Sequence, residues 1–162
     1  MIALSAKHRK ACATFLASLF LAGCSTITPV SPYDEPTDKA LTELQQSSDD
    51  FIVDLIAHAS EDANSYGHHQ DFYQAADQKL RRLEFRVSSI HANTPTVKLV
   101  GDIRSVLLGS GRCDPDGASL RDLHCNSGKA GPTKVALEAS RRSINQTIGA
   151  ALTLELAKKV GD

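Results

Sequence analysis

The chain has 162 residues, of which 41% are hydrophobic and 23% are charged, a composition typical of one globular domain rather than two. The formal net charge at pH 7 is −1, with 18 lysines and arginines against 19 acidic residues. Because binding to a phosphate backbone depends on an excess of clustered cations, this balance argues against a nucleic-acid partner.

The N-terminal residues 1–23 have the organisation of a secretory signal. A basic segment, Lys7-His8-Arg9-Lys10, precedes an apolar run from Ala11 to Ala22, and small residues stand before a cleavage position. The run of about 12 residues is well short of the roughly 20 that a transmembrane helix needs. A cleaved signal therefore fits this segment better than a membrane span.

The stretch Leu21-Ala22-Gly23-Cys24 resembles the lipobox of bacterial lipoproteins. In that family the cysteine is acylated with fatty acids such as palmitate and becomes the first residue of the mature chain. The resemblance implies lipidation of Cys24 and attachment to a membrane of the cell envelope. Because Ser25 and not an aspartate follows the cysteine, it also implies the outer membrane, on the side that faces the periplasm. A cleaved signal without a lipid is the alternative.

Cleavage before Cys24 simplifies both the charge and the cysteines. Removal of three cations and no acids takes the formal charge from −1 to −4, and Cys12 leaves with the signal. Only Cys113 and Cys125 then remain unmodified. In an oxidising periplasm such a pair predicts a disulfide, whereas in the cytosol it would suggest a metal site.

Residues 24–36 predict an extended tether, because prolines are frequent and few side chains are large and apolar. At about 3.1 Å per residue, the 12 residues from Ser25 to Pro36 would hold the domain up to about 37 Å from the membrane. Its end is similar to the opening of small proteobacterial envelope lipoproteins of unassigned role, in the dipeptides Tyr33-Asp34, Thr37-Asp38, Leu41-Thr42 and Leu44-Gln45. The folded domain is expected over residues 37–162.

Two long helices are predicted in the first half of this domain. The first begins near Thr37, a possible N-cap, and ends between Ser60 and Tyr66. Its apolar face recurs at three- and four-residue steps, through Leu41, Leu44, Ser48, Phe51, Ile52, Leu55, Ile56 and Ala59. The second runs from about His69 to Ala92. Its apolar seam is Ala76, Leu80, Leu83, Val87 and Ile90, and its opposite, solvated face holds Asp77, Lys79, Arg81, Arg82, Glu84 and Arg86.

A third helix follows Asn93-Thr94-Pro95 and ends at Gly109. Its apolar residues are Val97, Val100, Ile103, Val106, Leu107 and Leu108. Residues 109–132 predict an irregular stretch that the disulfide closes, with one helical turn at Leu120 and Leu123. The last helix is expected from Pro132 to Val160, with an apolar face of Leu137, Ile144, Ile148, Ala151, Leu152 and Leu156, and surface ion pairs from Glu138 to Arg142 and from Glu155 to Lys159.

No segment alternates apolar and polar residues at period two, so no strand is predicted. Helices joined by short connections favour antiparallel neighbours. The sequence therefore predicts an all-α fold, a small antiparallel bundle of about four helices with one disulfide-closed loop.

The nucleophilic and ionisable residues of the sequence do not form a known catalytic motif. The sequence contains no Gly-x-Ser-x-Gly nucleophile motif and no phosphate loop, and we expect neither an enzyme nor a cofactor. His68-His69, with Glu61, Asp62 and Asp71 nearby, is the best metal candidate, although adjacent histidines in a polar turn are usually solvated, and no metal site is predicted. Asp114-Pro115-Asp116-Gly117 lacks the closing glutamate of a calcium loop and predicts a turn.

Two functional classes remain from the sequence. The first is a non-catalytic interaction or structural module that binds another envelope protein. Its contact would be an exposed helix face or the disulfide-closed loop, whose polar residues are Asp114, Asp116, Arg121 and Asp122. The alternative is a periplasmic ligand- or metal-binding sensor that uses the His68-His69 region.

Overall fold

The computed structural model describes residues 30–161, so Cys24 and the predicted signal lie outside the described residues. This part of the chain forms five α-helices packed together, and it contains no strand. The helices are α2 (Glu35–Ala57), α3 (Gln70–Ser89), α4 (Thr94–Leu108), α5 (Leu120–Asn126) and α6 (Lys134–Gly161), with 3-10 turns η1 (Asp62–Asn64), η2 (Tyr66–His69) and η3 (Gly128–Ala130). The predicted all-α bundle is confirmed, and α5 is a full short helix where one turn was expected.

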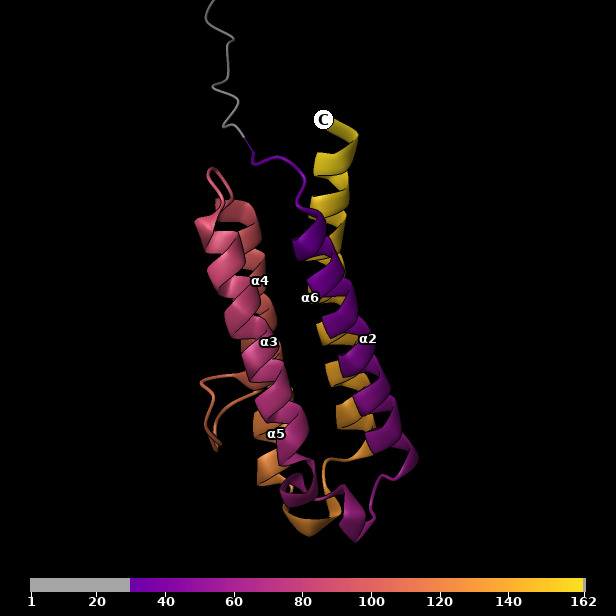
Figure 1. The fold of residues 1–162 in the computed structure, drawn as a ribbon. Coiled ribbons are helices and arrows are strands. Elements are labelled where there is room, and N and C mark those ends of the chain that lie inside the picture. Colours follow the sequence, from indigo (N-terminus) through magenta and orange to yellow (C-terminus); the bar gives the residue numbers. More distant parts are fainter. Residues whose placement is uncertain (1–29, 162) are drawn as a thin grey trace, which may run out of the picture.

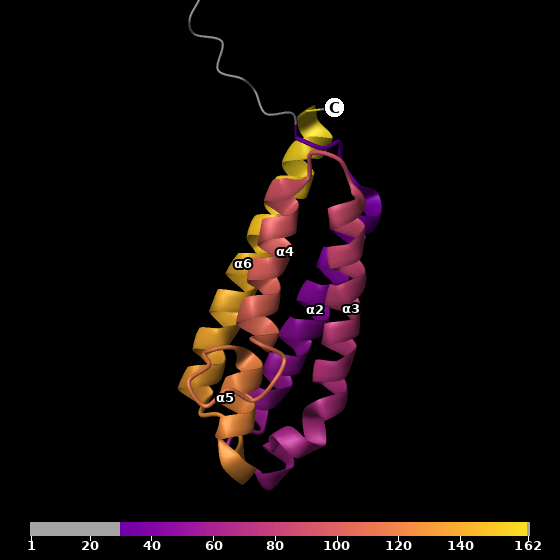
Figure 2. The same cartoon turned by 90° about the vertical axis from the view of Figure 1, so that its left-hand side faces the viewer.

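The four long helices run antiparallel to their chain neighbours, and the described N-terminal segment enters at the same end as the C-terminus of α6 (Figure 1). Helix α6 packs along both α2 and α4, and α4 also packs along α3. Contact between α2 and α3 is the least extensive among these four neighbouring pairs. The short α5 lies near the opposite end, beside α4 and α6 (Figure 2).

The core consists of the apolar stripes that the three- and four-residue spacings predict. Its fully buried side chains include Leu41, Leu44, Ile52, Leu55, Tyr73, Leu80, Ile103, Leu107, Leu108, Leu137 and Ile144. Two predicted core residues are surface residues instead, because Val97 is 36% exposed and Leu156 is 50% exposed. Leu156 is exposed because the buried stripe of α6 continues through Glu155 and Lys158.

The first helix begins earlier than predicted, and a different residue caps it. Asp34 is the N-cap, and its carboxylate accepts a hydrogen bond from the backbone N–H of Thr37, with an N···O distance of 3.1 Å. Thr37 is buried within the first turn and donates its hydroxyl to the same carboxylate. Pro36 fits the first turn, where its missing N–H leaves no bond unmade.

The connection between α2 and α3 is longer than the sequence indicated. Helix α2 ends at Ala57, and Ser60 has a positive φ of 78°, which stops the helix before the predicted region. Helix α3 ends at Ser89, ahead of the predicted end at Ala92, because Ala92 adopts a φ of 57° in the turn to α4. Such left-handed backbone cannot continue a right-handed helix.

Two charged clusters connect neighbouring helices. Arg141 of α6 forms a two-pronged bond with Asp49 of α2, at 2.7 and 2.8 Å, and Asn145 donates to the same carboxylate. Arg104 of α4 reaches both Glu84 and Asp77 of α3. The polar face of α3 is therefore not solvated throughout, since these two acids are partly covered by α4.

Candidate functional site

The predicted disulfide is present between Cys113 and Cys125, whose Cα atoms lie 6.0 Å apart. It joins the connection after α4 to the last turn of α5 and closes the loop that was expected to be disulfide-bonded. Asp114 and Asp116 are exposed on this loop, and Arg121 is partly buried. Their exposure leaves the two aspartates available for contact with a partner.

Asp122, the fourth predicted contact residue, is only 2% exposed and faces inward. Its carboxylate accepts hydrogen bonds from the hydroxyl and the backbone N–H of Ser119, while its own N–H donates to the Ser119 hydroxyl, which is a capping box. It also accepts from the backbone N–H of Asp114 at 3.1 Å. Asp122 therefore starts α5 and ties down the loop instead of presenting a charge.

Gly109 allows the loop to approach this carboxylate. Its φ is +58°, and a Cβ atom added there would stand 2.5 Å from Oδ2 of Asp122 and 2.9 Å from Oγ of Ser119. Only glycine combines that backbone conformation with so close an approach. The end of α4 and the start of α5 are consequently held against each other.

We expect that replacing both Cys113 and Cys125 by serine lowers the free energy of unfolding by about 3 kcal/mol, since the closed loop of about a dozen residues restricts the unfolded chain. Urea unfolding followed by circular dichroism measures the difference. The matched control is the wild-type protein under reductant, which should unfold at the same lowered midpoint. Equal midpoints for oxidised, reduced and serine-substituted protein would contradict the prediction.

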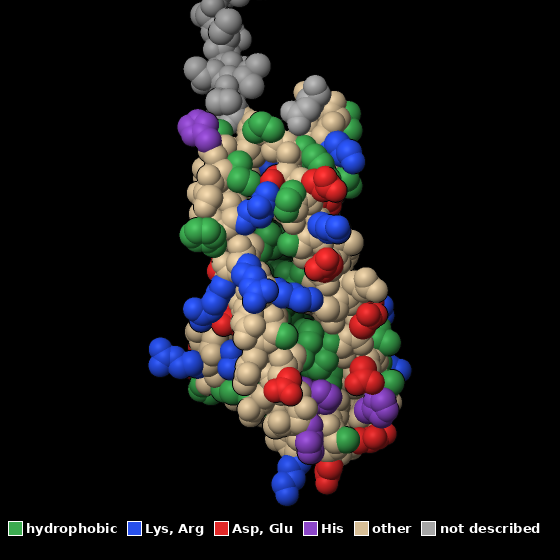
Figure 3. All heavy atoms as spheres, viewed as in Figure 1, with side chains coloured by type: hydrophobic (Ala, Val, Ile, Leu, Met, Phe, Trp, Pro, Cys, Tyr) green, Lys and Arg blue, Asp and Glu red, His purple; other side chains and the backbone are tan. Residues whose placement is uncertain are grey.

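Histidine side chains gather near the end of the bundle opposite the end of α6 (Figure 3). His124 of α5 is fully buried there. Its Nε2 lies 2.8 Å from the backbone oxygen of Asn64, and its Nδ1 lies 2.8 Å from the hydroxyl of Tyr73. Because a carbonyl can only accept, Nε2 carries the proton, and Nδ1 accepts the hydrogen of Tyr73.

Aromatic rings enclose this histidine. Phe51 of α2 stacks on Phe72 of α3 with ring centroids 3.7 Å apart, and Tyr66 lies edge-on to His124 at 5.7 Å. Arg121 donates its Nε hydrogen to the Tyr66 hydroxyl at 3.0 Å. Burial raises the pKa of Tyr73 above its ordinary value, so its hydroxyl stays protonated and remains a donor. This cluster joins α5 to α2, η2 and α3.

The His68-His69 pair is divided between two environments. Nδ1 of His68 lies 2.8 Å from the Ser65 hydroxyl, and the His69 ring packs against Phe51 at 5.4 Å. His69 also borders a cavity of about 170 Å³ together with Asp54 and His58. Within residues 30–161, no three histidine, cysteine or acidic side chains come close enough together to hold a metal ion.

We expect the protein to lose stability as the pH falls from about 7.5 to about 5. Burial lowers the pKa of His124 below its ordinary 6.5, and the nearby His69 adds to this effect. Above pH 6.5, His124 is neutral in both the folded and the unfolded protein. Just below pH 6.5, the unfolded chain takes up a proton at His124 and the folded protein does not, so the folded state loses stability. Urea unfolding at both pH values measures the change.

The variant His124→Gln should flatten this pH profile, whereas His91→Gln, at an exposed histidine, should leave it unchanged. His58 contributes with the opposite sign, because its backbone hydrogen bond to Asp54 and the nearby carboxylate raise its pKa. Because His58 is present in the wild type and in both variants, its contribution cancels when the pH profile of a variant is subtracted from that of the wild type. Parallel profiles for His124→Gln and wild type would refute the assignment.

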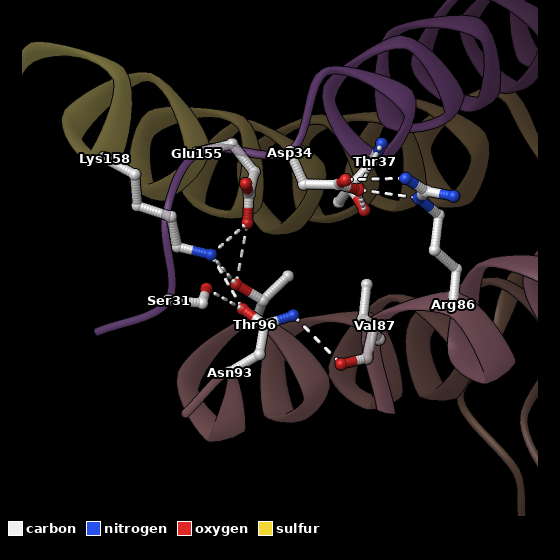
Figure 4. Close-up of polar contacts among 9 residues, drawn as sticks. All are labelled: Ser31, Asp34, Thr37, Arg86, Val87, Asn93, Thr96, Glu155 and Lys158. Carbon is white, nitrogen blue, oxygen red and sulfur yellow. Dashed lines mark hydrogen bonds and ion pairs between the residues drawn. The ribbon is translucent and has the colours of Figure 1, made fainter. Parts of the chain in front are cut away.

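A second buried polar cluster lies at the end where the chain enters the bundle (Figure 4). Lys158 of α6 is 8% exposed, and Glu155, one turn earlier, is 0% exposed. The Lys158 ammonium donates to Oε1 of Glu155 at 2.6 Å, to the Thr96 hydroxyl at 2.8 Å and to Oδ1 of Asn93 at 2.7 Å. Thr96 in turn donates to the same oxygen of Glu155. All three ammonium hydrogens are thus used.

This cluster fastens the N-terminal segment. Ser31 donates its hydroxyl to Oδ1 of Asn93 at 2.8 Å and its backbone N–H to the oxygen of Ala92 at 3.1 Å. Asp34 binds the guanidinium of Arg86 through two bonds of 2.7 and 2.6 Å, which lowers the pKa of that carboxyl to about 2. Residues 31–34, part of the expected tether, are thus held against the bundle by hydrogen bonds and an ion pair.

The spacing of apolar residues in α6 already indicated that Glu155 and Lys158 are buried, although an ion pair of Glu155 was expected on the surface. Ile144, Ile148, Ala151, Glu155 and Lys158 follow one 4-3-4-3 spacing, so both charged residues lie on the core stripe of α6. The predicted surface pair from Glu155 to Lys159 is wrong. His124 follows Leu120 by one turn in the same way, and both are buried.

No protein-family model, curated protein or solved structure matches the chain. Among residues 30–161, no helix combines the length and the apolar content that crossing a bilayer requires.

Proposed function

We propose that the chain is a membrane-anchored cell-envelope lipoprotein that acts as a non-catalytic interaction or structural module. The observation that carries the proposal is the sequence Leu21-Ala22-Gly23-Cys24 behind a basic segment and a short apolar run. A lipid on Cys24 attaches the chain to the membrane, and Ser25 favours the outer membrane, facing the periplasm. The bond between Cys113 and Cys125 supports an oxidising compartment.

The way the chain enters the bundle supports an anchoring role. Ser31 is seven residues from Cys24, which allows at most about 25 Å at 3.6 Å per residue, so a lipid on Cys24 keeps Ser31 close to the bilayer. The hydrogen bond from Ser31 to Asn93 and the ion pair between Asp34 and Arg86 fix this N-terminal segment to α4 and α3. The opposite end, with α5 and the disulfide, then points away from the membrane.

The use of the buried polar groups supports a non-catalytic module. His124 and Tyr73 bond each other and hold α5, and Lys158 and Glu155 hold the N-terminal segment. The bonded atoms of these four side chains are used in structural contacts, and all four side chains are shielded from solvent. A partner protein would instead meet the exposed residues of the loop, Asp114 and Asp116, or a surface of the long helices.

Fatty-acid labelling of cells that express the wild type and Cys24→Ala tests the anchor. We expect label on the wild-type protein alone, and we expect detergent to be needed for its extraction, because two or three acyl chains at about 0.8 kcal/mol per buried methylene hold a protein firmly in a bilayer. The matched control is Cys12→Ala, which should retain the label. Equal labelling of wild type and Cys24→Ala would disprove lipidation.

A further inference from the structure

A groove of about 250 Å³ lies between α2 and α3, the pair of neighbouring long helices that touch least. Its apolar lining consists of Ala40, Leu44 and Leu83, of which Leu44 and Leu83 are only 1% and 3% exposed. Ala40 is partly exposed, and together with the alkyl chains of the exposed Lys79 and Arg82 it supplies the apolar surface that reaches solvent. Figure 3 shows hydrophobic side chains visible between these helices.

The edge of the groove on α3 is cationic. Lys79, Arg82 and Arg86 line it at spacings of three and four residues, which places them in a row along one side of the helix. Lysine and arginine side chains gather over the middle of this face in Figure 3. The opposite edge, on α2, carries the exposed acid Glu43.

The charges of this row are largely unsatisfied within residues 30–161. Arg82 makes no ion pair or hydrogen bond there, and Lys79 has only a 3.4 Å contact with the Ser47 hydroxyl. Arg86 is bound to Asp34. Because Lys79 and Arg82 have no ionic partner among residues 30–161, the row favours an anionic occupant.

We propose that this groove binds an acidic amphipathic helix of a partner protein. The inference deepens the proposed interaction role, on which it rests. The occupant's apolar side chains lie on Ala40 and on the alkyl chains of Lys79 and Arg82, and its carboxylates face the charged ends of those two side chains. The row from Lys79 to Arg86 extends about 10 Å at 1.5 Å per residue, which matches about two turns of a partner helix.

The groove walls favour a helix over an extended peptide. An extended segment gains affinity by pairing its backbone with a free sheet edge, and α2 and α3 use their own backbone groups internally in this region. A helix satisfies its backbone by itself and presents apolar residues at i, i+3, i+4 and i+7. Acids on the flank of that stripe would repeat at the same spacing as Lys79, Arg82 and Arg86.

Fluorescence anisotropy with synthetic probes tests the inference. One probe is an amphipathic peptide of about 18 residues, long enough to form helix in isolation, with leucines on one face and glutamates on its flanks. The second probe has lysine at each glutamate position. The full mature chain, oxidised and carrying Cys24→Ala for solubility, should bind the glutamate probe and not the lysine probe.

Charge reversal provides the decisive comparison. The double variant Lys79→Glu, Arg82→Glu should weaken binding of the glutamate probe at least about tenfold and should gain binding of the lysine probe. The matched control is Lys134→Glu, Arg142→Glu, which makes the same change in net charge at two exposed positions of α6. That control should retain wild-type binding of both probes.

Three results would overturn the proposal. The first is equal binding of the two probes, or equal loss in the α6 control, either of which means non-specific attraction. The second is dimerisation by sedimentation velocity that Lys79→Glu, Arg82→Glu abolishes, which makes a second copy the occupant. The third is displacement of the glutamate probe by phosphatidylglycerol vesicles, which makes the occupant a lipid surface. None of these depends on lipidation, so labelling of Cys24 tests the anchor separately.

Discussion

Replacing Lys158 by methionine should lower the free energy of unfolding by about 3–5 kcal/mol, because it leaves an uncompensated charge in the protein interior. Glu155 is 0% exposed, and the ammonium of Lys158 is its ionic partner at 2.6 Å. The other carboxylate oxygen, Oε2, has no hydrogen-bond partner among the described residues. Urea unfolding followed by circular dichroism measures the loss.

The double variant Glu155→Leu, Lys158→Met should recover most of that loss, because both charges leave and apolar side chains of similar volume replace them. The matched control is Lys159→Met, one residue along α6. Lys159 is exposed and lies over the Tyr33 ring at 5.1 Å, so its removal should cost no more than about 1 kcal/mol. A single variant as stable as wild type would mean that the pair is not buried as described.

The same single variant should also loosen the N-terminal segment. Asn93 accepts hydrogen bonds from both Lys158 and Ser31, so loss of the ammonium removes one side of the shared contact. Hydrogen exchange at the backbone N–H of Ser31, which bonds the oxygen of Ala92, should become faster. Stability and the docking of the N-terminal segment at Ser31 are thus linked through one buried cluster.

The variant Leu80→Asp should cost at least about 4 kcal/mol, which is enough to unfold much of a domain of ordinary stability. Leu80 is 0% exposed on the inner face of α3, and a carboxylate there would lose its hydration without gaining a partner. Loss of helical circular dichroism at 25 °C, or a large shift of the urea midpoint, measures the effect.

Phe85→Asp is the control for this substitution, because Phe85 lies on the same helix and is 78% exposed. Its replacement should change stability by less than about 1 kcal/mol. If the two aspartate variants were equally stable, the inward face of α3 would be assigned wrongly. Unfolding of both Leu80→Asp and Phe85→Asp would mean that α3 does not tolerate aspartate for reasons other than burial.

The helices could be predicted from the sequence because burial of one helix face makes apolar residues recur at steps of three and four. Leu41, Leu44, Ile52 and Leu55 of α2 follow this repeat and are buried. The ends of the helices were harder to predict from the sequence. Asp34 and Thr37 are both good caps, and the choice between them depends on Arg86, which lies far along the chain and holds Asp34 in place.

The sequence by itself therefore determined the all-α fold and the core stripes, since these depend on local spacing, and it favoured the pairing of Cys113 with Cys125 that the structure shows. Only the tertiary structure decided how the polar residues are used. Glu155 and Lys158 can lie in the core because Thr96 and Asn93, from another part of the chain, complete their hydrogen bonds. Periodicity identifies the face of a helix that is covered, but the polar groups that cover it come from segments distant in sequence.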